Sequence, residues 1–199
     1  MAVLNIRGCS VSSKLLALLF TVAPLILGGQ AEDYSSPAAI LEYQIKAAFL
    51  YNFAKFVEWP AEKSGDDRRP ILAGVIGRDP FGPTLDQTFN GKTVNGRALA
   101  IRRVAGLAEL KRCHILFISS SEKSRLAEIL SALGNASVLT VSEIDQFAEL
   151  GGMINFTKEE NKIRLEINVD IAAQAGIRIS SKLLKLVRVV RTEVRDGRN

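Results

Sequence analysis

The stretch Pro70-Ile71-Leu72-Ala73-Gly74-Val75-Ile76 decides the fold, because it is almost continuously apolar. Such a run is typical of a strand whose two faces are both buried, as in the middle of a parallel sheet. Strand and helix patterns alternate after it, with helices at 83–89, 107–110 and 121–133 and strands at 98–102, 114–118 and 138–141. This alternation favours a parallel sheet with helices packed on its faces.

The pattern changes in the last third of the chain. Segments 153–157 and 163–168 alternate apolar with polar residues around a turn, which predicts an antiparallel hairpin at the sheet edge. From Ser180 to about Glu193 apolar residues recur at helical spacing, so we predict a final helix. The expected fold is α/β, a single domain with a mostly parallel doubly wound sheet of about six strands, an antiparallel edge hairpin and flanking helices.

A helix is predicted ahead of the sheet, at 41–59. Ile45, Phe49, Phe53 and Phe56 recur there at spacings of three and four, which gives the helix one strongly aromatic face. Pro60 ends the helix.

The N-terminus has the pattern of a cleavable export signal. Arg7 and Lys14 form a basic start, an apolar run covers 15–27, and the small-residue sequence 28–31 follows. This run is shorter than the roughly 20 residues that a membrane-spanning helix needs. We therefore predict a signal peptide at 1–31 and one exported domain at 32–199.

The charge pattern argues against nucleic acid as a partner. The whole chain carries a formal net charge of +5, and most of the excess in the exported part lies at Lys182, Lys185, Arg188, Arg191, Arg195 and Arg198. A cationic excess confined to one short stretch is not typical of a nucleic-acid-binding domain. Four of these residues recur every three positions and form either a solvated face or a surface for anionic lipid or an acidic partner; they are Lys182, Lys185, Arg188 and Arg191.

Residues that carry chemistry are few. The one histidine, His114, follows Cys113, and neighbours in a strand point to opposite faces, so the two cannot act as a catalytic pair. The turn at 74–79 lacks the third glycine of a dinucleotide-binding motif. We predict no enzymatic activity, no cofactor and no metal site. Cys113 is the only cysteine left after export, so it is either a small buried residue or a thiol that pairs between chains.

Several motifs together resemble the YfiR family. They are 42–60 (EYQIKAAFLYNFAKFVEWP), 77–82 (GRDPFG), 94–97 (VNGR), 113–118 (CHILFI), 151–154 (GGMI) and 180–184 (SSKLL). The resemblance implies a periplasmic regulator without catalytic activity, which binds the periplasmic domain of an inner-membrane diguanylate cyclase and restrains its output. It further implies release by an outer-membrane lipoprotein, an effect on cyclic-di-GMP and biofilm formation, and a homodimer.

The cysteines depart from the family pattern. Members of the family often carry a cysteine aligned near Gly74, as a partner for the one that matches Cys113. Glycine stands there in this chain, so control through an internal disulfide is not expected.

The predicted partner-binding residues are Tyr51, Trp59, Glu166, Asn168 and Arg191, because Trp, Tyr and Arg carry much of the binding energy of interfaces. Trp59 before Pro60 has a second interpretation, as a side chain that fills the core. A different functional hypothesis also stays open: the switch point of the sheet, near 77–79 and 119–121, holds a small molecule for a transport or two-component system.

Overall fold

The structure, a computed structural model, describes residues 36–60, 63, 69–185 and 187–191. The predicted signal peptide at 1–31 lies outside the described residues. Within the described ranges no helix has the length and apolar character needed to cross a membrane.

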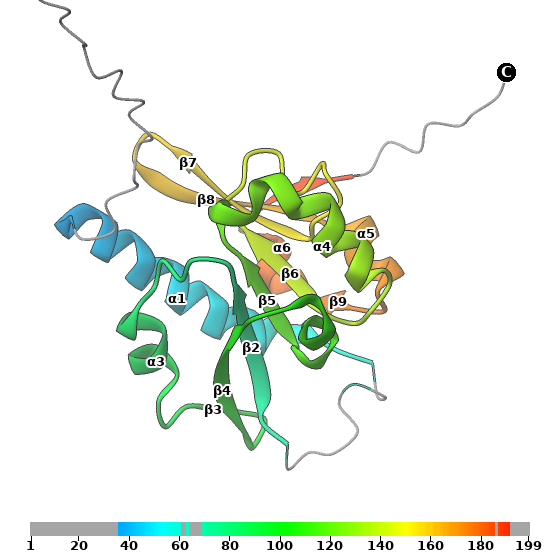
Figure 1. Cartoon of the computed structure of the whole chain (residues 1–199), viewed down its shortest axis with the longest axis horizontal. Coiled ribbons are helices and arrows are strands. Elements are labelled where there is room, and N and C mark those ends of the chain that lie inside the picture. Colours follow the sequence, from blue (N-terminus) through cyan, green and yellow to red (C-terminus); the bar gives the residue numbers. More distant parts are fainter. Residues whose placement is uncertain (1–35, 61–62, 64–68, 186, 192–199) are drawn as a thin grey trace, which may run out of the picture. The chain divides into compact units, whose positions relative to one another are not determined.

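Among the described residues, eight strands form one sheet, in the order β10-β8-β7-β6-β5-β2-β4-β3 (Figure 1). Their bounds are β2 (Ile71–Ile76), β3 (Thr93–Val94), β4 (Arg97–Val104), β5 (Ile115–Ile118), β6 (Leu139–Ser142), β7 (Ile154–Glu159), β8 (Lys162–Asn168) and β10 (Arg188–Val190). Strands β4, β2, β5, β6 and β7 run parallel to their neighbours in this order. The β7–β8 hairpin and the β3–β4 pair are antiparallel, so the sheet is mixed as predicted.

The apolar stretch that decides the fold forms the central strand β2. It pairs with β4 on one side and β5 on the other, and all of its residues except Leu72 are buried. The prediction of a strand covered on both faces is therefore confirmed.

Helices cover both faces of the sheet (Figure 1). On one face lie α1 (Pro37–Phe56) and α3 (Pro83–Phe89), and α5 (Val169–Gln174) and α6 (Ser181–Leu184) contribute to the same core. On the other face lie the 3-10 helix η1 (Leu107–Arg112) and α4 (Leu126–Leu133), with η2 (Ser120–Arg125) leading into α4. Two separate apolar cores result, one on each side of the strands.

Helix α1 begins earlier and ends earlier than predicted. Ser36 caps its start by accepting a hydrogen bond from the N–H of Ala39 at 3.2 Å. The chain leaves the helix after Phe56 because β1 (Val57–Glu58) pairs with β9 (Arg178–Ile179).

The predicted final helix from Ser180 to Glu193 is wrong. The structure has the one-turn helix α6 there, followed by β10, which pairs in parallel with β8. Val187, Val189 and Val190 are β-branched and favour extended backbone. The open edge of β8 pairs with this stretch as a parallel strand, so tertiary pairing overrides the helical spacing.

The predicted hairpin is present, and its turn has Glu160 and Asn161 at φ 48° and 61°, as a two-residue hairpin turn requires. It lies one strand in from the edge, because β10 covers β8. The fold class is confirmed, and the short strands β3 and β10 account for the difference from about six strands.

Candidate functional site

A cluster of charged residues around a buried lysine, here called the Lys46 cluster, lies between α1 and the carboxyl end of β6. Lys46 is on the core-facing side of α1 and is only 4% exposed. Its Nζ donates to Oε1 of Glu42 at 2.6 Å and to Oε2 of Glu143, the residue that follows β6. A charge so deeply buried is normally paired with an opposite charge, and Lys46 has two carboxylate partners.

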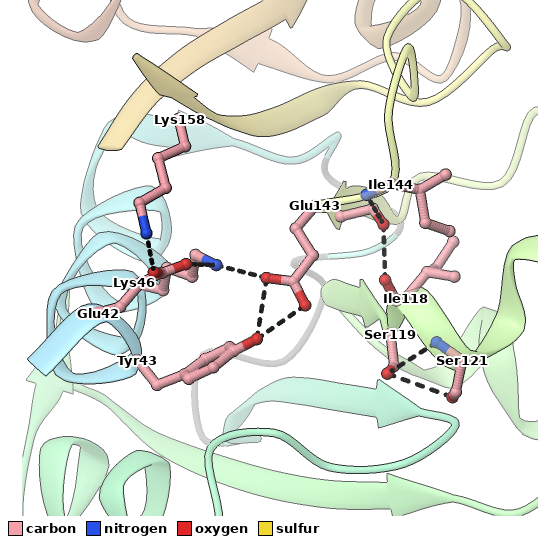
Figure 2. Close-up of polar contacts among 10 residues, drawn as sticks. Glu42, Tyr43, Lys46, Ile118, Ser119, Ser121, Glu143, Ile144 and Lys158 are labelled. Atoms are coloured by element: carbon pink, nitrogen blue, oxygen red, sulfur yellow. Dashed lines mark hydrogen bonds and ion pairs between the residues drawn. The ribbon is translucent and has the colours of Figure 1, made fainter. Parts of the chain in front are cut away.

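Two further side chains complete this cluster (Figure 2). The hydroxyl of Tyr43 donates to both carboxylate oxygens of Glu143, at 2.9 and 3.1 Å. Lys158 of β7 donates to Oε2 of Glu42 at 3.2 Å. The cluster therefore joins α1 to the end of β6 and to the β7–β8 hairpin.

The charges within the cluster balance. Burial alone would raise the pKa of Glu42, but the hydrogen bonds and positive charges of Lys46 and Lys158 outweigh it and hold this pKa below its usual value. The Lys46 ammonium also lies 4.5 Å from the ring centre of Tyr43. Both carboxylates, of Glu42 and Glu143, already bind lysine or tyrosine side chains of this chain. The cluster therefore holds α1 against the sheet, and neither carboxylate is arranged as a general base open to a substrate.

The switch point of the sheet lies beside this cluster, where β2 and β5 end. Ser119 caps η2, its Oγ accepting from the N–H of Ser121 at 3.4 Å, and the Ser121 hydroxyl accepts from the N–H of Arg78 at 2.9 Å. A Cβ built on Gly77 would lie 2.5 Å from Oγ of Ser121. The loops that follow β2 and β5 are thus in direct contact. Ser119 caps η2, and Ser121 bonds the two loops together.

A second polar cluster lies at the opposite, amino end of the strands. Nδ1 of His114 accepts the N–H of Leu72 at 3.1 Å, and its Nε2 lies 3.1 Å from a guanidinium nitrogen of Arg97. Burial and the positive charges of Arg97 and Lys63 lower the pKa of His114 to about 4. The imidazole is therefore neutral at physiological pH. Cys113 packs into the opposite core, so the two neighbours point to different faces as predicted.

Two of the predicted partner-binding residues lie toward the end of α1 and just beyond it. Tyr51 and Trp59 are both half-buried and pack against the first core. The indole N–H of Trp59 donates to the carbonyl of His114 at 3.1 Å, and the two rings meet edge to face.

The other three predicted partner-binding residues gather at the β8–β10 edge of the sheet. Glu166 pairs with Arg188 of β10 at 3.0 Å, and Arg191, which follows β10, is exposed. Asn168 is 1% exposed. Its side chain caps α5 and donates to the carbonyl of Ala148 at 2.8 Å. The structure thus brings Glu166, Asn168 and Arg191 together, and leaves Tyr51 and Trp59 elsewhere.

Sequence reasoning missed the Lys46 cluster. Glu143 is far from Lys46 along the chain, and no spacing rule connects the two positions. A signal was nevertheless present, because Tyr43 and Lys46 lie on the same side of the helix as Leu50 and Phe53. A lysine within an apolar helical stripe indicates a buried partner.

Two solved structures are similar to this one. A conserved domain protein from Vibrio cholerae O1 biovar El Tor is 11% identical, with a TM-score of 0.51, over 74% of this chain and 59% of that chain. The ABC domain in complex with L-Trp from Streptococcus pneumonia is 12% identical, with a TM-score of 0.44, over 60% of this chain and 55% of that chain. The chain thus spans less than two thirds of either protein, and the first likeness supports the fold alone.

A family model described as YfiR/HmsC-like (DUF4154) matches residues 43–188. The match begins at Tyr43 and runs through the whole sheet into β10, so it includes Lys46, Glu143 and Lys158 of the Lys46 cluster. The chain therefore belongs to the YfiR/HmsC-like family.

Proposed function

We propose that this protein is a periplasmic regulator that binds the periplasmic domain of an inner-membrane diguanylate cyclase and holds its cytoplasmic output low. The observation that carries the proposal is the family match over residues 43–188, because the YfiR/HmsC-like family suggests a periplasmic regulator of a diguanylate cyclase rather than an enzyme. Release by an outer-membrane lipoprotein and assembly into a homodimer belong to the same proposal.

The chemistry of the described residues agrees with a binding role. The polar groups of the Lys46 cluster bond to one another, and the serines at the switch point cap η2 and bond the two loops together. A regulator of this kind needs only different affinities for two states of its partner. A tenfold change in output corresponds to about 1.4 kcal/mol of that difference, which a modest interface supplies.

We place the sensor contact at the β8–β10 edge, around Arg191 and the Glu166–Arg188 pair. Arg191 is exposed and the Arg188 side chain is 72% exposed, so both guanidinium groups are accessible to an acidic surface. The buried side chain of Asn168, at the end of β8, stabilises this edge by capping α5 and by its hydrogen bond to Ala148. Tyr51 and Trp59 remain proposed contacts of the same partner, and each must give up part of its packing to serve as one.

The proposal is tested by deleting the gene and measuring cyclic-di-GMP in the cells. We expect the level to rise, and to return to normal when the wild-type gene is supplied. A pull-down with the purified periplasmic domain of the candidate cyclase then tests direct binding. Unchanged cyclic-di-GMP together with no capture of the cyclase domain would overturn the proposal.

The contact surface is tested separately with a pair of matched charge reversals. Arg191→Glu is expected to weaken capture of the cyclase domain at least tenfold and to leave cyclic-di-GMP high. Arg112→Glu makes the same charge change at an exposed position of η1 and should behave like wild type. Equal capture by both variants would place the sensor contact elsewhere.

A further inference from the structure

The edge of the sheet opposite β10 is only partly covered. Strand β4 has eight residues, Arg97–Val104, but β3 pairs with just Arg97 and Ala98. One more backbone bond follows, from the N–H of Leu99 to the carbonyl of Lys92 at 3.3 Å. The rest of β4 is paired on its β2 side only.

Strand β3 is short because the chain turns away at Gly91. This residue has φ +67°, which glycine adopts without strain, and the chain before it belongs to α3. If β3 were longer, residues 90 and 91 would lie opposite 101 and 100. The part of β4 beyond Leu99 is therefore open because β3, the chain's own edge strand, does not extend alongside it.

This open part presents unpaired backbone groups. Backbone N–H and C=O groups alternate in direction along a strand, so those of Ile101 and Arg103 point the same way as those of Leu99, away from β2. Within the described part of the chain, the outward backbone groups of these two residues have no hydrogen-bond partner. Such a row of groups is a ready-made template for pairing with another extended backbone.

A groove of about 380 Å³ lies along this edge, between β4 and the end of α3. Its apolar lining comes from Phe89, Leu99 and Ile101, and its polar lining from Asp86, Gln87, Asn90 and Gly91. The Asp86 carboxylate is paired with the guanidinium of Arg103 at 2.6 and 2.9 Å. The groove thus has an apolar floor and a rim whose charge is already balanced by the chain itself.

We propose that the free edge of β4 binds an extended, uncharged segment of another protein, which continues the line of β3 and places an apolar side chain in the groove. This mode of recognition combines main-chain hydrogen bonds with pockets for alternate side chains. A second copy of this chain fits less well, because two β4 edges paired about Ile101 would set Arg103 over the apolar groove at Leu99. The surface lies at the other edge of the sheet from the proposed sensor contact, so it is independent of that proposal.

The test uses amide hydrogen exchange of the purified protein, followed by NMR, with the acetylated and amidated hexapeptide Thr-Val-Thr-Val-Thr-Val as the probe. We expect saturating peptide to slow exchange of the Ile101 and Arg103 amides at least tenfold. The amides of Ala100 and Arg102 point toward β2 and should not change. A control peptide with proline in place of the second valine should have no effect. Slowing at other sites only, or none, would overturn the proposal.

A matched pair of variants gives a second test of peptide binding at the β4 edge. Ile101→Lys puts a charge over the groove and should weaken peptide binding at least tenfold. Leu150→Lys makes the same kind of change at an exposed apolar residue in the 143–152 loop and should leave binding unchanged. Equal binding by both variants contradicts the proposal, as does a dimer that protects the Ile101 amide without any peptide. Should Ile101→Lys fail to fold, the exchange pattern of the wild-type protein decides.

Discussion

Gly74 sits directly against the sulfur of Cys113. A Cβ built on Gly74 would lie 2.5 Å from Sγ of Cys113, and 3.1 and 3.2 Å from side-chain atoms of Val104 and Leu116. Any larger side chain at this position must displace the sulfur, which explains why glycine stands beside an unpaired cysteine in the core. A cysteine at the same position could instead bond to that sulfur.

We predict that Gly74→Cys forms a disulfide with Cys113 in an oxidising compartment. Closing a loop of about 40 residues stabilises the folded state by about 4 kcal/mol in the chain-entropy treatment. Non-reducing electrophoresis after thiol alkylation detects the bond, and thermal unfolding with and without reductant measures its effect. Gly74→Ser is the control, because it adds a side chain of similar size without a bond and should be less stable than wild type under both conditions. Two alkylatable thiols in oxidised Gly74→Cys would contradict the prediction.

His114 should make the stability depend on pH. Its pKa is lowered to about 4 by burial and by neighbouring cations, against 6.5 in the unfolded chain. Between these values the unfolded state binds more protons than the folded state, so stability is complete above pH 6.5 and falls as the pH drops toward 4. The expected loss across this window is about 3 kcal/mol, measured by urea unfolding at a series of pH values.

The control for the pH effect is His114→Asn, because an asparagine oxygen can accept the N–H of Leu72 but does not titrate. This variant should lose most of the dependence between pH 6.5 and 4.5. The carboxyl of Glu42, whose pKa is also lowered, contributes only below about pH 4.5. A slope that persists unchanged in His114→Asn would assign the effect to other groups.

At the scale of elements, the Lys46 cluster decides where α1 sits. We predict that Lys46→Met destabilises the protein by about 3–5 kcal/mol, because it leaves the carboxylate of Glu143, whose side chain is only 12% exposed, without its cation. Replacing both partners, as Lys46→Met with Glu143→Leu, should cost much less than the sum of the single changes. Urea unfolding of the four proteins in this cycle measures the coupling. Additive effects would mean that the two groups do not depend on each other.

The elements also show what a sequence can predict and what it cannot. The strand at 71–76 was predictable because its apolar run is too short for a helix and is followed by alternating strands and helices. The hairpin at 154–168 was predictable because apolar and polar residues alternate on both sides of a short turn. Strand β10 was not, because Leu183, Leu184, Val187 and Val190 fit a helical stripe as well as a strand. The open edge of β8 decides between the two, and that edge exists only in the folded sheet. The Lys46 cluster was missed for the same reason, since Glu143 reaches it only through the fold.

For the whole molecule, one sheet carries two different edges. The β10 edge has exposed arginines, whereas the β4 edge has an apolar groove and unpaired backbone groups. The central strands between them are buried on both faces, so the two edges are held at a fixed separation. The surfaces proposed for the sensor domain and for the extended segment therefore do not overlap, and binding at one can affect binding at the other only through a change within the sheet.

The compartment in which this protein lies should matter for its effect on cyclic-di-GMP as much as its binding surfaces do. We predict that the chain without residues 1–31 folds normally, because the core residues of the described structure begin at Tyr43. Its thermal unfolding should match that of the exported protein.

In cells that lack the gene, however, this shortened chain should leave cyclic-di-GMP high, because it stays on the wrong side of the membrane from the sensor domain. The full-length gene, expressed to the same level, should lower it, and the exported protein should begin at Glu32 by mass spectrometry. Full complementation by the shortened chain would show that the regulated partner is met inside the cell.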